Sequence, residues 1–275
     1  MARQRLIQGF LLHLALTAGV ALFMLPLLWM VIAATLPDSE LFAYPPRILP
    51  GEWFGRNLEA LQRTVGFSRV LVNSVSIAVI YTAASVLLCA MGGYAFAKYR
   101  FRGREVLFLG IVATLTIPTY VTLLPQFILI TRLGLIDTYW AVVLPTLANA
   151  LGIFLMRQNM HAVPDDLIES ARIDGAGEFQ IFWSVALPIL RPALAALGII
   201  LFLFQWNDYL WPLIVLRSQE AFTVPVALGR LVGLTRVNYG GIMVGTVIAT
   251  VPFLVVFLFL QRHFVAGITG GAVKQ

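Results

Sequence analysis

The chain has 275 residues, of which 60% are hydrophobic and only 12% charged, and its mean hydropathy is +0.88. Soluble globular domains carry about a quarter charged residues, so this composition excludes that class and indicates a protein with several membrane spans. The net charge of +6 does not indicate nucleic-acid binding, because the basic residues lie at the edges of apolar runs, where membrane topology places them.

The first apolar run covers residues 10–35 and follows Arg3 and Arg5. A cleavable signal peptide has an apolar region of about 7–15 residues, and this run is longer, so we expect an uncleaved first span. Residues 36–70 then form a segment of mixed charge, with prolines at its start and helical spacing over 57–65. Two interpretations of this segment stay open, a surface touched by an extracytoplasmic partner or a loop lying on the lipid headgroups.

Five further apolar runs predict membrane helices, because each has at least 19 residues and none contains a lysine or arginine. At 1.5 Å per residue such helices nearly or fully cross a hydrocarbon core of about 30 Å, where only a helix satisfies its own backbone. The runs are 71–97, 106–131, 138–156, 192–216 and 240–260. The predicted fold is therefore an all-α membrane protein with six transmembrane helices, and residues 1–275 form a single transmembrane domain.

Lysine and arginine placement predicts the orientation of these spans. With the N-terminus inside, the inner segments hold eleven basic residues and the outer segments eight. The short loops decide the matter, since Lys98–Glu105 has four basic residues in eight positions, whereas 132–137 has one in six. Both termini and the loop 157–191 are then expected to be cytoplasmic.

Polar residues within the spans are candidates for a solute path. Asp208 is the only acidic residue inside the six runs, and a charge at membrane depth indicates either a pathway or a helix–helix contact. Spans three and four also combine prolines with polar residues, as in the broken helices of transporters, although membrane helices also tolerate such residues without a function. The candidates are Tyr120, Gln126, Asn149, Asn207 and Asp208.

The sequence offers no catalytic machinery. A phosphate-binding P-loop needs Gly-Lys followed by Ser or Thr, but Lys98 follows Ala97 and Lys274 precedes Gln275. Cys89 is the only cysteine, which excludes a disulfide framework and a thiolate zinc cluster, and the three histidines are far apart. We therefore expect no catalytic residue, no metal site, no cofactor bound by this chain and no ATP hydrolysis by it.

The charged loop, residues 157–191, holds five of the 13 acidic residues and is predicted to contain two short helices. Pro164 with Asp165 and Asp166 is typical of a helix start, which predicts a helix over 165–173 and a turn at Asp174-Gly175. A second helix over about 176–186 would place Phe179, Phe182 and Val185 on one side. This pattern favours a docking element, and the alternative is an amphipathic hairpin on the bilayer surface.

The loop also carries a spaced motif. Glu169-Ser170-Ala171 is followed after three residues by Gly175, after nine more by Val185, and then by Leu187-Pro188. This motif resembles the Glu-Ala-Ala motif of permease subunits of binding-protein-dependent ABC importers, with Ser170 and Val185 as the departures. Segments 93–97, 206–208 and 264–274 are similar to the carbohydrate-uptake branch, and in particular to its smaller maltose- or glycerol-3-phosphate-type subunit. Asn73, within the similar Asn73-Ser74 pair, joins the candidate path residues.

The resemblance implies a function and a set of partners. The loop would be a coupling helix seated in a cleft of an ATPase subunit, with the tail after Phe264 nearby. Expected partners are two ATP-binding subunits that carry ATP and Mg, a second homologous permease, an extracytoplasmic solute-binding protein, a sugar-class substrate and membrane lipid, in the bacterial inner membrane. The implied coupling residues are Glu169, Ser170, Ala171, Asp174, Gly175, Ala176 and Pro188. The alternatives are a stand-alone secondary transporter or channel and an intramembrane enzyme, and the particular sugar or polyol phosphate stays open.

Overall fold

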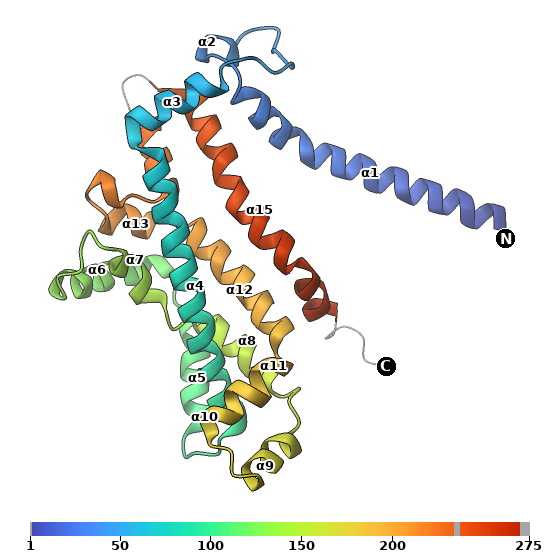
Figure 1. Ribbon diagram of the computed structural model, residues 1–275, viewed down its shortest axis with the longest axis vertical. Helices are drawn as coiled ribbons and strands as arrows, with labels where there is room; N and C mark the ends of the chain where they lie inside the picture. The colour runs from blue at the N-terminus through green and yellow to red at the C-terminus, as the bar shows by residue number, and fades with distance from the viewer. Residues whose placement is uncertain (1, 234–236, 270–275) are drawn as a thin grey trace. The chain divides into compact units, whose positions relative to one another are not determined.

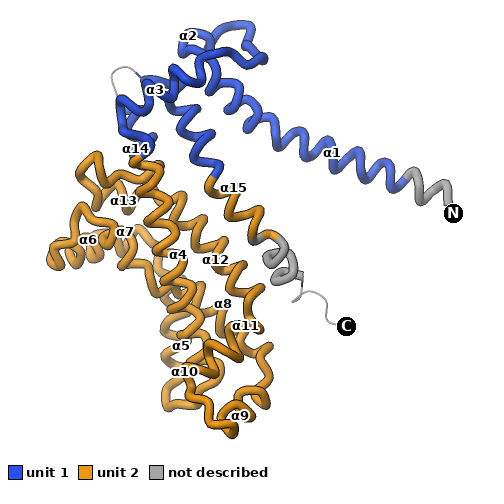
Figure 2. Tube along the Cα trace, in the orientation of Figure 1, with its two compact units in different colours: residues 1–68, 227–251 blue, residues 69–226, 252–275 orange. Residues whose placement is uncertain are grey.

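The computed structural model describes the backbone of residues 2–233 and 237–269, and the side chains of residues 8–233, 237–259 and 261. Within these ranges all regular elements are helical (Figure 1). The chain divides into two compact units, residues 1–68 with 227–251 and residues 69–226 with 252–275 (Figure 2). The side chains of 264–274, expected near an ATPase, lie outside the described residues.

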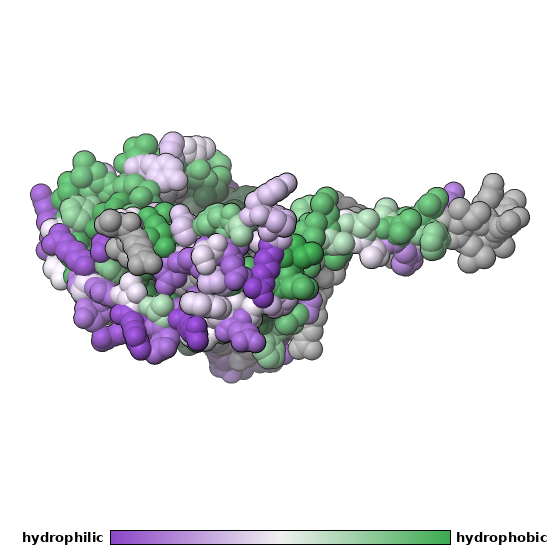
Figure 3. Space-filling view, turned by 90° about the horizontal axis from the view of Figure 1, so that it is seen from above, coloured by the Kyte–Doolittle hydropathy of each residue, from purple (hydrophilic) through white to green (hydrophobic). Residues whose placement is uncertain are grey.

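Within the part of the chain that the structure describes, three helices are long and apolar enough to cross a bilayer by themselves. They are α1 (Ala2–Ala33), α4 (Phe67–Lys98) and α15 (Tyr239–Thr269), and they contain the predicted spans 71–97 and 240–260 and nearly all of 10–35. Almost every residue of Gln8–Ala33, the apolar part of α1, is at least partly exposed, with Ala33 at its end as the exception, and Figure 3 shows mostly hydrophobic residues along its described part. A helix that is apolar all round and unburied is suited to a membrane.

Three further apolar stretches among the described residues are bent pairs of helices, which gives up to six spans there if each pair crosses once. The first joins α5 (Arg104–Thr114) to η1 (Thr119–Thr122) and α6 (Leu123–Arg132) with a bend of 97°. The second joins α7 (Tyr139–Val143) and η2 (Leu144–Thr146) to α8 (Ala150–Met160) with a bend of 49°. The predicted runs 106–131 and 138–156 are therefore not continuous helices, in part because the residue before Pro118 is disfavoured in a helix.

The predicted run 192–216 is also interrupted. The helix α12 (Arg191–Trp206) ends at Trp206, and α13 (Leu210–Val215) begins after a break at residues 207–209. The α12 helix instead pairs with the preceding stretch Glu178–Ile189 through a bend of 83°. Apolar length alone predicted a single helix here, but Asn207 and Asp208 prefer local hydrogen bonds that end a helix. Beyond α13 follow η4 (Gln219–Ala221) and α14 (Val224–Val232).

The segment 36–70 contains α2 (Asp38–Leu41) and α3 (Phe54–Val65), so the helical spacing predicted over 57–65 is confirmed. The buried Asn57 side chain donates to the carbonyl oxygens of Ala34 and Leu36, at 3.0 and 2.9 Å. These bonds satisfy carbonyl groups at the end of α1, which has no further helical turn to accept them. The start of α3 is thereby fixed to the end of α1.

The packing of the second unit depends on close contact between α4 and α8. A Cβ atom added to Gly93 would lie 2.5 Å from Cβ of Met156 and 2.7 Å from the backbone nitrogen of Arg157. Small residues at such positions let two membrane helices approach closely, where dispersion contacts stabilise the pair. Met156 is fully buried as a result.

The charged loop folds largely as its sequence predicts. The helix α9 (Asp165–Ile173) has the predicted bounds, and the second helix consists of α10 (Glu178–Ile181), a π-helical turn η3 (Phe182–Ala186) and α11 (Leu187–Ile189). Phe179 and Phe182, which were predicted to lie on one side of the second helix with Val185, differ in their burial. Phe179 is exposed, whereas Phe182 is buried with its ring centroid 5.4 Å from that of Tyr94.

Candidate functional site

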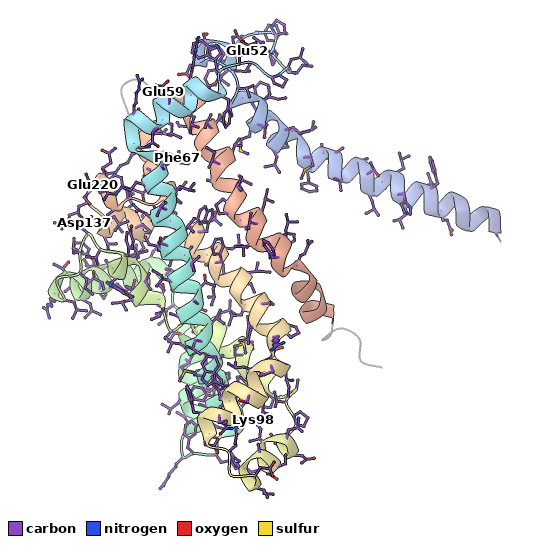
Figure 4. All side chains as sticks on the ribbon, viewed as in Figure 1. Glu52, Glu59, Phe67, Lys98, Asp137 and Glu220 are labelled. Atoms are coloured by element: carbon purple, nitrogen blue, oxygen red, sulfur yellow. The ribbon has the colours of Figure 1, made fainter. Side chains whose placement is uncertain are left out.

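The N-terminal end of α9 is fixed to the end of α4 by Lys98. The Lys98 Nζ donates to the carbonyl oxygen of Val163 and pairs with Oδ1 of Asp165, both at 2.6 Å. The Lys98 side chain is only 6% exposed, and Figure 4 shows it at the end of α4 beside the charged loop. Its ammonium group lowers the pKa of Asp165 by hydrogen bonding and by its charge. Buried lysines are rare unless paired, so this contact is a structural requirement of the loop.

Glu178, the first residue of α10, joins three segments. Its Oε2 accepts a hydrogen bond of 2.8 Å from the hydroxyl of Tyr99, just after α4. Its Oε1 lies 2.6 Å from Nε of Arg172, in the last turn of α9. The Arg172 guanidinium lowers the pKa of Glu178, while burial and then the Glu178 carboxylate raise the pKa of Tyr99 to about 12. Both helices of the charged loop are therefore bonded to the same end of α4.

A second ionic contact supports the same end of the molecule. Both Oε atoms of Glu105, in α5, lie 2.7 and 2.8 Å from Nη2 of Arg157, in α8. The Arg157 guanidinium carbon also lies 3.8 Å from the centroid of the Phe108 ring, a cation–π geometry. The start of the charged loop is thus held to α5 as well as to α4.

Gly175 ends α9 with two characteristic hydrogen bonds. The amide of Gly175 donates to the carbonyl of Arg172, and that of Ala176 to the carbonyl of Ala171, both at 3.0 Å. This is a Schellman arrangement, which requires a left-handed residue, and Gly175 has φ of +84°. The turn leaves Ile173, an apolar residue, 86% exposed at the tip of α9.

The structure places four of the seven implied coupling residues around one hollow of the charged loop. This hollow, of about 320 Å³, is lined by Ala171, Asp174, Gly175, Ala176, the end of α10 and the middle of the π-helical stretch. Glu169 faces a neighbouring hollow together with Lys98, Arg100 and Arg172. Ser170 donates its hydroxyl to the carbonyl of Leu167, and Pro188 is exposed. Sequence reasoning did not single out Glu178, Lys98, Tyr99 or Ile173, because their roles depend on contacts between distant segments.

The opposite end of α4 is fixed by Asn73. Its Nδ2 donates to the carbonyl oxygens of Glu220 and Phe222 at 2.7 and 3.0 Å, and its Oδ1 accepts from the hydroxyl of Tyr139 at 2.5 Å. The neighbouring Ser74 hydroxyl oxygen accepts a hydrogen bond from the amide of Val224. Asn73 is 2% exposed and its amide is fully engaged, so in this conformation it binds the segment 220–224 to α4.

Four of the predicted path residues line one hollow of about 690 Å³ within the second unit. They come from the broken stretches around η1, α6 and the α12–α13 junction, and they are Tyr120, Gln126, Asn207 and Asp208. The hollow is completed by residues that sequence reasoning had not named as path residues, among them Thr119, Thr146, Tyr209 and Trp211. Asn73 and Asn149 do not line it, and Asn149 instead caps α8 by accepting from the amide of Gly152 at 2.9 Å.

The α12–α13 junction holds Asp208 in a fixed place. The amide of Asn207 still bonds to the carbonyl of Leu203, and the amide of Asp208 to that of Gln205, before the chain turns into α13. The indole nitrogen of Trp211 donates to the carbonyl of Ala141 at 2.9 Å, which anchors α13 on α7. The backbone amide of Trp211 interacts electrostatically with the Asp208 carboxyl group. The carboxylate is thus positioned by its own turn beside the hollow.

Asp137 provides a further link at the same side of the second unit. Its Oδ1 accepts from the amides of Arg217 and Ser218 at 2.8 and 3.0 Å. Burial opposes ionisation of this carboxyl, but these bonds and the Arg217 charge outweigh it and lower its pKa. Figure 4 shows Asp137 and Glu220 on the same side of α4. Among the described residues no cluster of three histidine, cysteine or acidic side chains is placed to hold a metal ion.

Comparison with known sequences finds a match over residues 89–270 to the family described as binding-protein-dependent transport system inner membrane component. The chain is 37% identical to the lactose transport system permease protein LacG of Rhizobium radiobacter, over 94% of this chain and 93% of that protein. It is 34% identical to the arabinooligosaccharides transport system permease protein AraQ of Bacillus subtilis, over 92% and 91%. It is also 34% identical to the sn-glycerol-3-phosphate transport system permease protein UgpE of Agrobacterium fabrum, over 98% of each.

Among solved structures, the fold is similar to a chain of a bacterial ABC transporter involved in the import of the acidic polysaccharide alginate. The TM-score is 0.80, with 23% identity over 94% of this chain and 96% of that one. A chain of a bacterial alginate ABC transporter in complex with a pentasaccharide-bound periplasmic protein gives a TM-score of 0.66 at 15% identity. At these identities the likeness concerns the fold alone.

Proposed function

Because the chain belongs to the family of binding-protein-dependent transport system inner membrane components, we propose that it forms part of the membrane path for a sugar-class solute. It is a permease subunit of an ABC importer and not an enzyme. The comparisons favour this function over a stand-alone secondary transporter or channel. Relatives named for lactose and for arabino-oligosaccharides support the sugar class.

The proposed arrangement in the membrane has six spans and both termini in the cytoplasm of a bacterial cell. Three long helices and three bent pairs support the number of spans, and the basic loop 98–105 supports the orientation. In this arrangement residues 1–275 act as one permease domain, and the charged loop lies on the cytoplasmic side of the inner membrane. Lipid covers the unburied apolar surface wherever no partner subunit does.

The observation that carries the coupling role is the double attachment of the charged loop to one end of α4. Lys98 holds the start of α9, and Tyr99 holds Glu178 at the start of α10. A force applied to the loop therefore reaches a 32-residue helix, about 48 Å long at 1.5 Å per residue. At the far end of that helix Asn73 is bonded to the segment 220–222. A packed helix with bonds at both ends transmits displacement because its interior deforms little.

In the proposed assembly two ATP-binding subunits supply that force, and they carry the ATP and Mg. The exposed Ile173, with Glu169 and the Gly175 turn beside it, would occupy a cleft on one of them. A second homologous permease would complete the solute path, and an extracytoplasmic solute-binding protein would deliver the solute. The hollow lined by Tyr120, Asn207 and Asp208 is the part of the path that this chain would contribute.

Co-purification tests this function. The permease is expressed with its ATP-binding subunits, and the amount of ATPase retained by it is compared for wild type, Glu169→Lys and Ile173→Asp. Both positions are exposed, so the variants are expected to insert normally but to retain much less ATPase. A matched control is Asp166→Lys, an exposed position in the first turn of the same helix. Equal ATPase retention in all variants would contradict the coupling role.

A further inference from the structure

The hollow at the α12–α13 junction has an uneven distribution of charge. Among the described residues that line it, Asp208 is the only charged one, and no lysine, arginine or histidine is present. The remaining polar groups are neutral hydroxyls and amides, such as those of Thr119, Gln126 and Asn207. Two tyrosine rings, Tyr120 and Tyr209, also face it. Any solute inside meets one carboxyl group and has no cation from this chain to pair with.

This lining suits an uncharged saccharide. Sugar hydroxyls can donate hydrogen bonds to a carboxylate, and they can both donate to and accept from amide groups. Aromatic rings cover the apolar faces of a pyranose. Small-molecule sites typically combine such surfaces with a few placed polar groups in a hollow of about 300–1,000 Å³, a range that includes the observed 690 Å³. Binding of an anion would instead bring two negative charges together away from bulk water, where their repulsion is poorly screened.

We propose that Asp208 makes the hollow selective against anions, so that the solute carried past this chain is a neutral saccharide rather than a phosphate ester or a uronate. This inference rests on the proposed function and makes its substrate class narrower. Among the similar proteins, some are named for lactose or arabino-oligosaccharides and another for glycerol 3-phosphate, and this inference assigns the chain to the first kind. Specificity here comes from a repulsive group as well as from attractive ones.

The competing explanation is that Asp208 only stabilises the turn into α13. The backbone amide of Trp211 interacts with its carboxyl group, so removal of the side chain would disturb the turn. Asparagine caps helices about as well as aspartate, and it has nearly the same shape without the charge. Asp208→Asn therefore removes the charge and keeps the turn, which separates the two explanations.

The test measures thiol accessibility in the hollow of the assembled importer in lipid nanodiscs. The native Cys89, which is buried, is replaced by serine, and Thr119→Cys places one thiol in the lining. Two methanethiosulfonate reagents are used, one neutral and one bearing a sulfonate. For each reagent, the rate of reaction with this thiol is divided by the rate of reaction of the same reagent with 2-mercaptoethanol. We expect the neutral reagent to react at least about tenfold faster, and the preference to fall below about threefold in Asp208→Asn. A preference that is absent, or that persists in Asp208→Asn, overturns the proposal.

Transport provides the second arm. The complete importer, with its own solute-binding protein, is reconstituted in proteoliposomes, and ATP-driven uptake is ranked among lactose, arabinotriose, sn-glycerol 3-phosphate and an alginate trisaccharide. A neutral sugar ranked first supports the proposal, and an anionic solute ranked first overturns it. ATPase retention is measured on the same preparation. If an anion is taken up and ATPase retention is normal, only the proposed charge selectivity is overturned. If ATPase retention is lost, the proposed coupling function itself is overturned.

Discussion

The hydroxyl of Tyr99 lies 2.8 Å from Oε2 of Glu178, so the end of α4 is bonded directly to the first residue of α10. Arg172 holds the other carboxylate oxygen of the same residue at 2.6 Å. One carboxylate thus joins a long apolar helix to both short helices of the charged loop. This relationship determines how the loop can act on the rest of the second unit.

Tyr99→Phe is expected to weaken coupling without unfolding the protein. The variant loses one hydrogen bond to a charged group, which contributes about 1–2 kcal/mol to stability at this partly exposed position. It keeps the aromatic contact with Tyr94. The measurement is the number of solute molecules imported per ATP hydrolysed in proteoliposomes. That ratio should fall while ATPase retention stays near that of wild type. A ratio equal to that of wild type would show that this bond does not transmit force.

Gly175→Ala is expected to destabilise the loop through the backbone alone. The left-handed conformation costs a residue with a Cβ about 1–2 kcal/mol, and no other atom lies within 4 Å of the added carbon. Gly177→Ala is the matched control, since that position is equally open but has φ of −70°. Limited proteolysis of the loop should become faster in Gly175→Ala only. Equal rates in both variants would contradict this expectation.

Gly93→Ala is expected to lower the thermal stability of the second unit. The new Cβ would lie 2.5 Å from that of Met156, and overpacking of this kind typically costs about 1–3 kcal/mol. Gly110→Ala serves as control, because that site in α5 has no neighbouring atom within 4 Å and alanine favours a helix. The midpoint of thermal unfolding in detergent checks the pair, and a Gly93→Ala midpoint at or above that of Gly110→Ala would refute the packing argument.

Asn73→Ala is expected to reduce stability rather than change solute preference. The substitution removes the hydrogen bonds of Asn73 to the carbonyls of Glu220 and Phe222 and to the hydroxyl of Tyr139, each worth about 0.5–1.5 kcal/mol. Thermal unfolding and the ranking of transported solutes are both measured. A changed ranking at unchanged stability would place Asn73 in the solute path, which remains a prediction from the sequence.

The pH dependence of the loop should reflect Asp165. The Lys98 hydrogen bond and charge make the pKa of Asp165 lower in the folded protein than in the unfolded chain, where it is about 3.9. Its stabilising contribution is therefore complete above that unfolded value and is lost as the pH falls through the lower folded value. The difference in unfolding temperature between wild type and Asp165→Asn should be constant from pH 7 to 5 and disappear in stronger acid. A difference that shrinks between pH 7 and 5 would contradict this assignment.

Several local features were predictable from the sequence. Pro164 with two following aspartates predicted the start of α9, and Gly175 predicted its end, because capping and turn formation depend on neighbouring residues. The long helices α4 and α15 were predictable from apolar length. By contrast, the breaks at 115–118 and 207–209 were not located, since an apolar run of sufficient length looks the same whether its helix is straight or bent.

The site was predictable in part, for a related reason. Tyr120, Gln126, Asn207 and Asp208 were singled out by their polarity at membrane depth, and the structure brings these four together. Asn149 shared that polarity but caps α8 instead. The Glu178 contacts with Tyr99 and Arg172 were missed, because an exposed glutamate in a charged loop has no local feature that identifies its partners.

By itself the sequence determined that this is a helical membrane protein with a capped, charged loop, since apolar length, charge placement and turn residues act over a few neighbouring positions. Only the tertiary structure decided that Lys98 and Tyr99 hold that loop and that Asp208 shares a hollow with Tyr120. Those contacts join residues that are separated by 65 or more positions, and their distances depend on how the broken helices pack against α4 and α7.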